Sequence, residues 1–238
     1  GNVTYTGNMT IADKIKTGSV GIYKLGGTAP STITSSGNWS VGNSWYGIYL
    51  KGQGTTVNNS ADMTLGMSAV GIFSSGVDVI NNTGNIVVGE TDVKGDHNKV
   101  EDHLNSVGIY GAGGTKIYNA AGATIKVHED HSVGVYVDGT NTRFENHGII
   151  DIDNGGVGVI VRNGAIAINE TGGVITLGAN ASPICGAVNV GMSASGSGST
   201  IENRGTITIN SGVGMTIENQ AILRNTGTIN VNNGVGIT

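Results

Sequence analysis

Charged and histidine side chains that could bind a ligand concentrate in residues 89–105. Imidazole and carboxylate groups together can hold a divalent cation such as zinc. The histidines show no H-x-H or H-x-x-x-H spacing, so we weigh a metal site against an acidic surface for a cationic partner and against a solvated face. No metal ligand and no cofactor are therefore assigned. The residues of this segment that we predict to contact a ligand are Asp92, Asp96, His97, Glu101, Asp102 and His103.

Aromatic side chains form the second candidate site. Each directly follows a Val-Gly-Ile-like string, and the same position holds Ile160, Ser193 and Thr216 further along the chain. Aromatic pairs on neighbouring strands stabilise a sheet, and exposed rings also anchor protein and sugar ligands. Both readings stay open. The residues are Tyr23, Tyr49, Phe73, Tyr110 and Tyr136.

Catalytic chemistry has less support in the sequence. Asp151 and Asp153 are two residues apart and share a face of a predicted strand, as paired carboxylates of a polysaccharide-degrading enzyme would. We expect no Lys or Arg to align beside them. The single Cys185 cannot form an internal disulfide, and neither G-x-S-x-G nor G-x-x-x-x-G-K-[ST] occurs. The sequence therefore predicts that the chain is not an enzyme.

Composition narrows the class further. The 238 residues carry a net charge of −5, and no cluster of Lys and Arg provides the basic surface that nucleic acid requires. Glycine is abundant, at 42 residues, but has no Gly-X-Y period, and short apolar strings recur throughout. No segment has the apolar spacing of an amphipathic helix or the length of a membrane span. These features predict an all-β protein.

A repeat explains the glycines. Val-Gly-Ile strings recur at a mean step of about 27 residues, a period typical of solenoids. Each step holds three short strand-like pieces, so we expect a parallel β-helix with three strands per coil and about nine turns. The chain is predicted to be one unit, residues 1–238, with insertions at about 89–105 and 178–187. The glycines of the strings are Gly21, Gly47, Gly71, Gly108, Gly134, Gly158, Gly191, Gly214 and Gly236.

Alternation predicts which side chains point inward. In the first piece, Val133, Val135 and Val137 share the inner face, which leaves Gly134 and Tyr136 outside. The second piece is expected to contribute one inner residue per coil and the third piece two. The predicted inner residues of the second piece are Ile33, Val57, Val79, Ile117, Phe144, Ile201 and Leu223.

An asparagine recurs between the second and third pieces. Asn tolerates the left-handed conformation of a sharp corner, and stacked copies can hydrogen-bond as a ladder. The recurring residues are Asn59, Asn82, Asn119, Asn146, Asn169, Asn203 and Asn225.

Stacking of the coils also places charged residues together. Aligning Ser106 with Ser132 puts Asp102 and His103 beside His128 and Glu129, with Asp153 in the next coil. This alignment is the geometric basis of the possible metal group.

The strings "SVGIY", "ENRGTITI" and "RNTGTINV" resemble the passenger domains of type V autotransporter adhesins, most closely the very long outer-membrane adhesins of fusobacteria. The resemblance covers the whole chain. It implies a right-handed β-helix, exported to the bacterial cell surface and anchored by a C-terminal barrel that would lie outside this segment. We interpret the chain as an excerpt of a longer array.

The resemblance implies attachment as the function. The expected partners are a host cell-surface receptor protein or glycan, or the surface of a partner bacterium, and nucleic acid is not expected. The alternatives are a passive spacer within a longer adhesin and, with less support, a β-helical polysaccharide-degrading enzyme.

Overall fold

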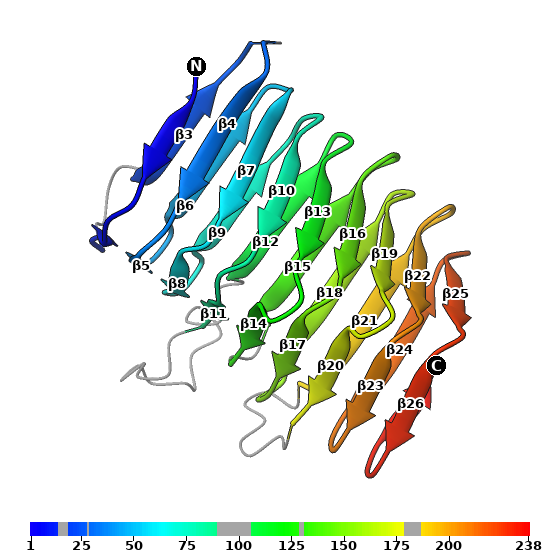
Figure 1. Ribbon diagram of the computed structural model, residues 1–238. Coiled ribbons are helices and arrows are strands. Elements are labelled where there is room, and N and C mark those ends of the chain that lie inside the picture. Colours follow the sequence, from blue (N-terminus) through cyan, green and yellow to red (C-terminus); the bar gives the residue numbers. More distant parts are fainter. Residues whose placement is uncertain (14–18, 28, 90–105, 129–130, 179–186) are drawn as a thin grey trace.

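A computed structural model describes residues 1–13, 19–27, 29–89, 106–128, 131–178 and 187–238 (Figure 1). These residues form 27 β-strands, and the described ranges contain no helix. Accordingly, no helix within these ranges is long and apolar enough to cross a membrane. The segments 90–105 and 179–186, which hold most of both predicted insertions, lie outside the described residues.

The strands form three parallel sheets of nine strands each, and the chain visits the sheets in turn (Figure 1). Sheet A contains β1 (Val3–Tyr5), β4 (Ser31–Ser35), β7 (Thr55–Asn59), β10 (Val79–Asn82), β13 (Lys116–Asn119), β16 (Arg143–Asn146), β19 (Ile166–Asn169), β22 (Thr200–Asn203) and β25 (Ile222–Asn225). Sheet B contains β2 (Met9–Ile11), β5 (Asn38–Val41), β8 (Asp62–Leu65), β11 (Ile86–Val88), β14 (Thr124–Val127), β17 (Ile149–Ile152), β20 (Val174–Leu177), β23 (Thr206–Ile209) and β26 (Thr228–Val231). Sheet C contains β3 (Val20–Leu25), β6 (Tyr46–Lys51), β9 (Val70–Ser74), β12 (Val107–Ala112), β15 (Val133–Asp138), β18 (Val157–Arg162), β21 (Val190–Ser195), β24 (Val213–Glu218) and β27 (Val235–Ile237).

This arrangement is a right-handed parallel β-helix, and the predicted fold class is confirmed. Each coil passes through one strand of sheet C, one of sheet A and one of sheet B before the chain returns to sheet C. Every pairing joins corresponding strands of neighbouring coils in parallel register, as β12 pairs with β9 and β15. Equivalent side chains of successive coils therefore lie directly above one another.

The core is a set of stacked apolar rows. In sheet B both predicted inner residues are buried in most coils, for example Ile150 and Ile152 in β17. Burying one such side chain stabilises the fold by about 1.5–3 kcal/mol. In sheet A one prediction was wrong: Ile80 rather than Val79 aligns with Val57 and is buried, because β10 pairs one residue out of the predicted phase.

The recurring glycine of sheet C faces the core, and the prediction that it points outward was wrong. A side chain on Gly134 would meet the methyl groups of Ile125 and Val127 on sheet B at 3.2 and 3.3 Å. Both Gly134 and Val135 are buried, so two consecutive residues face inward and strict alternation fails there. This local irregularity lies at the entry to sheet C, where the chain arrives from sheet B.

A close backbone contact explains why glycine is required at this position. A Cβ on Gly134 would lie 2.6 Å from the carbonyl oxygen of Gly158 in the next coil. The same contact, at 2.4–2.7 Å, joins each glycine of the series Gly21 to Gly214 to the glycine of the following coil. Since the obstacle is backbone and not a flexible side chain, only glycine fits.

The asparagine ladder is confirmed. Asn119 donates from Nδ2 to Oδ1 of Asn146 at 2.9 Å, and Asn146 donates to Asn169 at 2.8 Å, with all three side chains fully buried. Equivalent bonds run without interruption from Asn59 to Asn225. Each amide also donates to a backbone carbonyl at the corner, as Asn146 does to Gly148.

The backbone role predicted for these asparagines was wrong. They end the strands of sheet A, and none has a positive φ. The left-handed conformation occurs instead at other turns, for example at Asn141, Asn154 and Asn163. The ladder asparagines therefore fix the corner through their side chains alone.

Replacing Gly134 by Ala should lower the free energy of unfolding by about 1–3 kcal/mol, because the methyl group overpacks a site closed by backbone. Circular dichroism during urea titration measures the change. Ser193→Ala, on the outer side of β21, is the control and should stay within about 0.5 kcal/mol of the wild type. Equal stability of the two variants would contradict the close contact.

Replacing Asn146 by Ala should destabilise the fold by about 3 kcal/mol. The change leaves the buried amide donor of Asn119 and the buried oxygen of Asn169 without their partners, at roughly 1–3 kcal/mol each. Asn81→Ala is the matched control, because Asn81 donates to Asn58 at 2.9 Å in an exposed pair where water can substitute. Thermal unfolding of both variants should separate them clearly, and similar melting temperatures would contradict a stabilising ladder.

Candidate functional site

The predicted aromatic residues form a continuous stack on the outer side of sheet C. Each pair occupies equivalent positions on neighbouring strands, as Tyr110 does with Phe73 and Tyr136. Ring centroids lie 4.6 Å apart for Tyr49 and Phe73, 4.9 Å for Phe73 and Tyr110, and 5.3 Å for Tyr110 and Tyr136, with interplanar angles of 10°, 7° and 20°. Tyr23 packs on Tyr49 at 5.4 Å and is tilted by 37°. The predicted stacking is confirmed, while ligand binding by these rings stays a prediction.

A second apolar column borders the stack, and the sequence prediction missed it. Because the glycines face inward, the residue before each glycine faces outward, and this position is apolar in every strand of sheet C. Tyr46 belongs to this column, and its ring contacts Tyr49 at 5.0 Å and Phe73 at 5.7 Å, edge to face. We call the column the outer valine column: Val20, Tyr46, Val70, Val107, Val133, Val157, Val190, Val213 and Val235.

The two columns together form one surface on strands β3, β6, β9, β12 and β15, which we call the aromatic face. Most of its side chains are half-buried, since each is covered by its neighbours along the column. Tyr23, on its first strand, is 55% exposed. The ring faces within the stack cover one another, so mainly ring edges and hydroxyl groups meet solvent.

Burial raises the pKa of two hydroxyl groups of this face. Burial raises the pKa of Tyr110, and the charge of Asp138, the neighbouring Tyr136 and a hydrogen bond to the Asp138 carboxylate add to the rise. Burial also raises the pKa of Tyr46, with a smaller contribution from Tyr49. Asp138 is held in place by Nδ2 of Asn163, which donates to it at 2.6 Å. Both hydroxyl groups therefore stay protonated to a higher pH than a solvated tyrosine does.

The predicted charged site is largely outside the described residues. This applies to Asp92, Asp96, His97, Glu101, Asp102 and His103, and also to Glu129. One predicted neighbourhood is confirmed, because Nδ1 of His128 lies 3.2 Å from Oδ1 of Asp153 in the next coil. Among the described residues, no three His, Cys, Asp or Glu side chains gather in a way that could hold a metal ion.

One expectation about the carboxylates was wrong. Lys126 on β14 aligns with Asp151 on β17, and Nζ of Lys126 lies 3.5 Å from Oδ2 of Asp151. Both carboxylates, Asp151 and Asp153, thus have a basic partner one coil earlier. The prediction considered Arg143 and Arg162, which lie in other parts of the coil, and missed Lys126 at the equivalent position of the preceding strand of sheet B.

A second charged group lies on sheet A and was not predicted. Arg204 donates to Glu202 at 2.9 Å and to Glu170 at 3.1 Å, so one guanidinium joins two carboxylates from neighbouring coils. The hydrogen bond from Arg204 lowers the pKa of Glu202. This arrangement is an ion-pair network on the surface, and its groups are already paired with one another.

Comparisons with known proteins give little further information. No family profile matches the sequence, and no curated protein matches it. A crystal structure of a TibC-catalysed, hyper-glycosylated TibA fragment aligns with 98% of this chain and 100% of that fragment, at 15% identity and a TM-score of 0.14. A TM-score this low carries no argument about fold or function.

Replacing Tyr110 by Phe should remove one tyrosine that ionises late in an alkaline titration followed by phenolate absorbance. The folded-state pKa of Tyr110 is raised above the unfolded value near 10. Its contribution to stability is therefore complete below about pH 10 and is lost as the pH rises through the folded-state pKa. Above about pH 10, the free energy of unfolding of the variant should therefore fall less steeply with rising pH than that of the wild type.

Asp138→Asn is the companion variant for this titration. It keeps the ring and removes the charge, so Tyr110 should ionise at lower pH than in the wild type. The described environment would be contradicted if the tyrosine lost in Tyr110→Phe ionised near pH 10 and if Asp138→Asn left the titration unchanged.

Proposed function

We propose that this chain is a segment of an extracellular adhesin of the bacterial cell surface, and that it contacts a protein on the target cell through the aromatic face. One observation carries the proposal: the outer side of sheet C presents two adjoining apolar columns over five neighbouring strands. Extended apolar surface is unusual on a soluble protein and commonly marks an interaction site. Tyrosine is also enriched among the residues that dominate binding energy.

The fold itself does not require aromatic residues at these positions. Ser193 on β21 and Thr216 on β24 occupy the equivalent position in later coils, and these strands pair in the same parallel register. The scaffold therefore accepts small polar residues where the first five strands of sheet C carry rings. A binding role accounts for rings that are confined to one part of the β-helix.

The stacking geometry supports a protein partner over a sugar for this face. Sugars pack against open ring faces, whereas these rings cover one another with interplanar angles of 7–20° between Tyr49 and Tyr136. Edges, hydroxyl groups and valine methyls remain for contact, which suits the mixed apolar and polar surface of a protein. The residues predicted in the segment 89–105 remain a possible second contact for a cationic partner.

A passive spacer is the main alternative. The same stack favours it, because each aromatic pair between neighbouring strands contributes roughly 0.2–1 kcal/mol to the sheet without any ligand. A polysaccharide-degrading enzyme is the other alternative, and the position of Lys126 beside Asp151 is the observation in its favour. Both Asp151 and Asp153 already have partners, however, so the proposal includes no catalytic reaction.

The proposal is tested by attachment of protein-coated beads to cultured epithelial cells and to bacteria of other species. Tyr110→Thr with Tyr136→Thr should reduce attachment at least tenfold, since a few tyrosines commonly dominate contacts of this kind. Threonine is chosen because Thr216 shows that this column accepts it. Thr216→Ala is the control and should attach like the wild type.

Deletion of residues 90–104 distinguishes the two candidate contacts. If the double threonine variant attaches normally and the deletion variant loses attachment, the contact lies in the charged segment and not on the aromatic face. Normal attachment of both would support the spacer, and turnover of an acidic polysaccharide by the purified chain would replace the proposal with an enzyme.

A further inference from the structure

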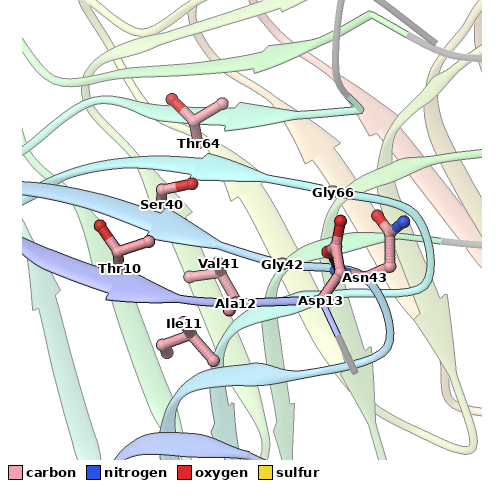
Figure 2. Close-up of a pocket in the computed structure, with 10 residues that line it drawn as sticks. All are labelled: Thr10, Ile11, Ala12, Asp13, Ser40, Val41, Gly42, Asn43, Thr64 and Gly66. Atoms are coloured by element: carbon pink, nitrogen blue, oxygen red, sulfur yellow. Dashed lines mark hydrogen bonds between the residues drawn. The ribbon is translucent and has the colours of Figure 1, made fainter. Parts of the chain in front are cut away.

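Two adjoining hollows lie on the outer side of sheet B, away from the aromatic face. One has a volume of about 210 Å³ and is shown in Figure 2, and the other has a volume of about 370 Å³. Both are lined by Thr10, Ser40 and Thr64, so they form one continuous depression over β2, β5 and β8. Ligand sites for small molecules commonly start at about 300 Å³. The combined depression therefore has room for one or two sugar rings.

The floor of the depression is a row of hydroxyl groups. Thr10 pairs in register with Ser40, and Ser40 with Thr64, so the three side chains project from neighbouring strands on the same side of the sheet (Figure 2). All three residues are exposed, and none of their hydroxyl groups has a hydrogen-bond partner within the described part of the chain. Neighbouring strands lie about 4.8 Å apart, which is close to the length of one pyranose unit in an extended chain.

One rim of the depression is held rigid by bonds between coils. Oδ1 of Asp13 accepts the backbone N–H of Asn43 at 2.6 Å, and Oδ1 of Asn43 accepts that of Met67 at 2.8 Å. The two side chains lie next to each other where the strands leave the sheet (Figure 2). Each uses one polar atom to bind the next coil, which leaves Oδ2 of Asp13 and Nδ2 of Asn43 for a ligand.

Side-chain oxygens on the opposite rim also accept backbone N–H groups of the next coil. Oδ1 of Asn8 accepts the backbone N–H of Asn38 at 3.0 Å, and Oδ1 of Asp62 accepts that of Asn85 at 2.9 Å. Nδ2 of Asn8, the side-chain amide of Asn38 and Oδ2 of Asp62 remain without partners in the described residues. The depression thus offers hydroxyl, amide and carboxylate groups whose side chains are already oriented before a ligand arrives.

We infer that this depression binds a neutral saccharide, with the sugar chain lying along the axis of the β-helix. Hydroxyl groups of a sugar both donate and accept hydrogen bonds, and the depression supplies free acceptors, free donors and hydroxyls that do both. Among the described residues, the charged side chains that line it are the carboxylates Asp13 and Asp62, which repel acidic sugars. Pre-oriented polar groups lower the entropy lost on binding.

The site is independent of the proposed adhesin contact. It lies on sheet B, uses no residue of the aromatic face and takes a different class of ligand. The experiment below uses the isolated chain and a soluble sugar, so attachment to cells does not influence its result.

The inference is tested by titrating the purified chain with cellotetraose, maltotetraose and mannotetraose, and with tetragalacturonic acid as the acidic counterpart. Isothermal calorimetry gives the affinity, and amide chemical shifts locate the site. We expect saturable binding of at least one neutral sugar, with shifts at residues 40–43 and 62–66. Ser40→Ala with Thr64→Val should weaken binding about tenfold, because each lost hydroxyl removes one or two hydrogen bonds.

Thr208→Val is the matched control. Thr208 occupies the same outer column of sheet B on β23, beyond the depression, so its loss should leave the affinity unchanged. The inference is overturned if no neutral sugar binds, if only the acidic sugar binds, or if the double variant binds as tightly as the wild type. Equal weakening by Thr208→Val would also overturn it, since that result would show a non-specific effect of the column.

Discussion

The contact between stacked glycines is the constraint on which the rest of the structure depends. Each glycine of sheet C places its carbonyl oxygen where the side chain of the glycine in the preceding coil would lie, at 2.4–2.7 Å from that position. This close approach allows the strands of sheet C to stack in parallel register at the corner where the chain arrives from sheet B. The same alignment brings Asn119, Asn146 and Asn169 within hydrogen-bonding distance. It also sets the spacing of the aromatic rings, so scaffold and surface have a common geometric origin.

Much of this fold could be predicted from the sequence because each coil repeats the same residue types at nearly the same step. The periodic glycines and asparagines indicated three parallel sheets, and the register that follows correctly predicted the ring stack from Tyr23 to Tyr136. The prediction that Gly134 points outward was wrong, because Gly134 and Val135 both face the core. The prediction assumed a regular strand, in which successive side chains point to opposite faces. That single error hid the outer valine column, because it assigned those residues to the interior. The predicted inner residue of β10 was also wrong. Val79 and Ile80 are both apolar, and only the pairing of Ile80 with Val57 shows which of them faces the core.

The candidate sites were predictable to different degrees. The rings follow a motif that recurs in adjacent coils, so their contacts follow directly from the register. Thr10, Ser40 and Thr64 carry no motif, and their common location becomes evident only when β2, β5 and β8 are aligned. The free polar atoms around them depend on which oxygen of Asp13 or Asp62 bonds the next coil, and no pattern in the sequence specifies that choice. The charged residues predicted in the segment 89–105 stay a prediction, because residues 90–105 lie outside the described residues.

The β-helix places the residues that stabilise it and the residues that it presents to solvent on opposite sides of the same strands. Inner positions are constrained by the glycine contact, the asparagine ladder and the apolar rows, whereas outer positions need only suit an extended strand. Sheet C shows this freedom directly, because Tyr136, Ile160 and Ser193 occupy one column on three successive strands. Two chemically different surfaces can therefore coexist on the same coils, an apolar one on β3, β6 and β9 and a polar one on β2, β5 and β8. Since neither surface supplies a core residue of the other, the side chains of each can change without altering the register on which both rely.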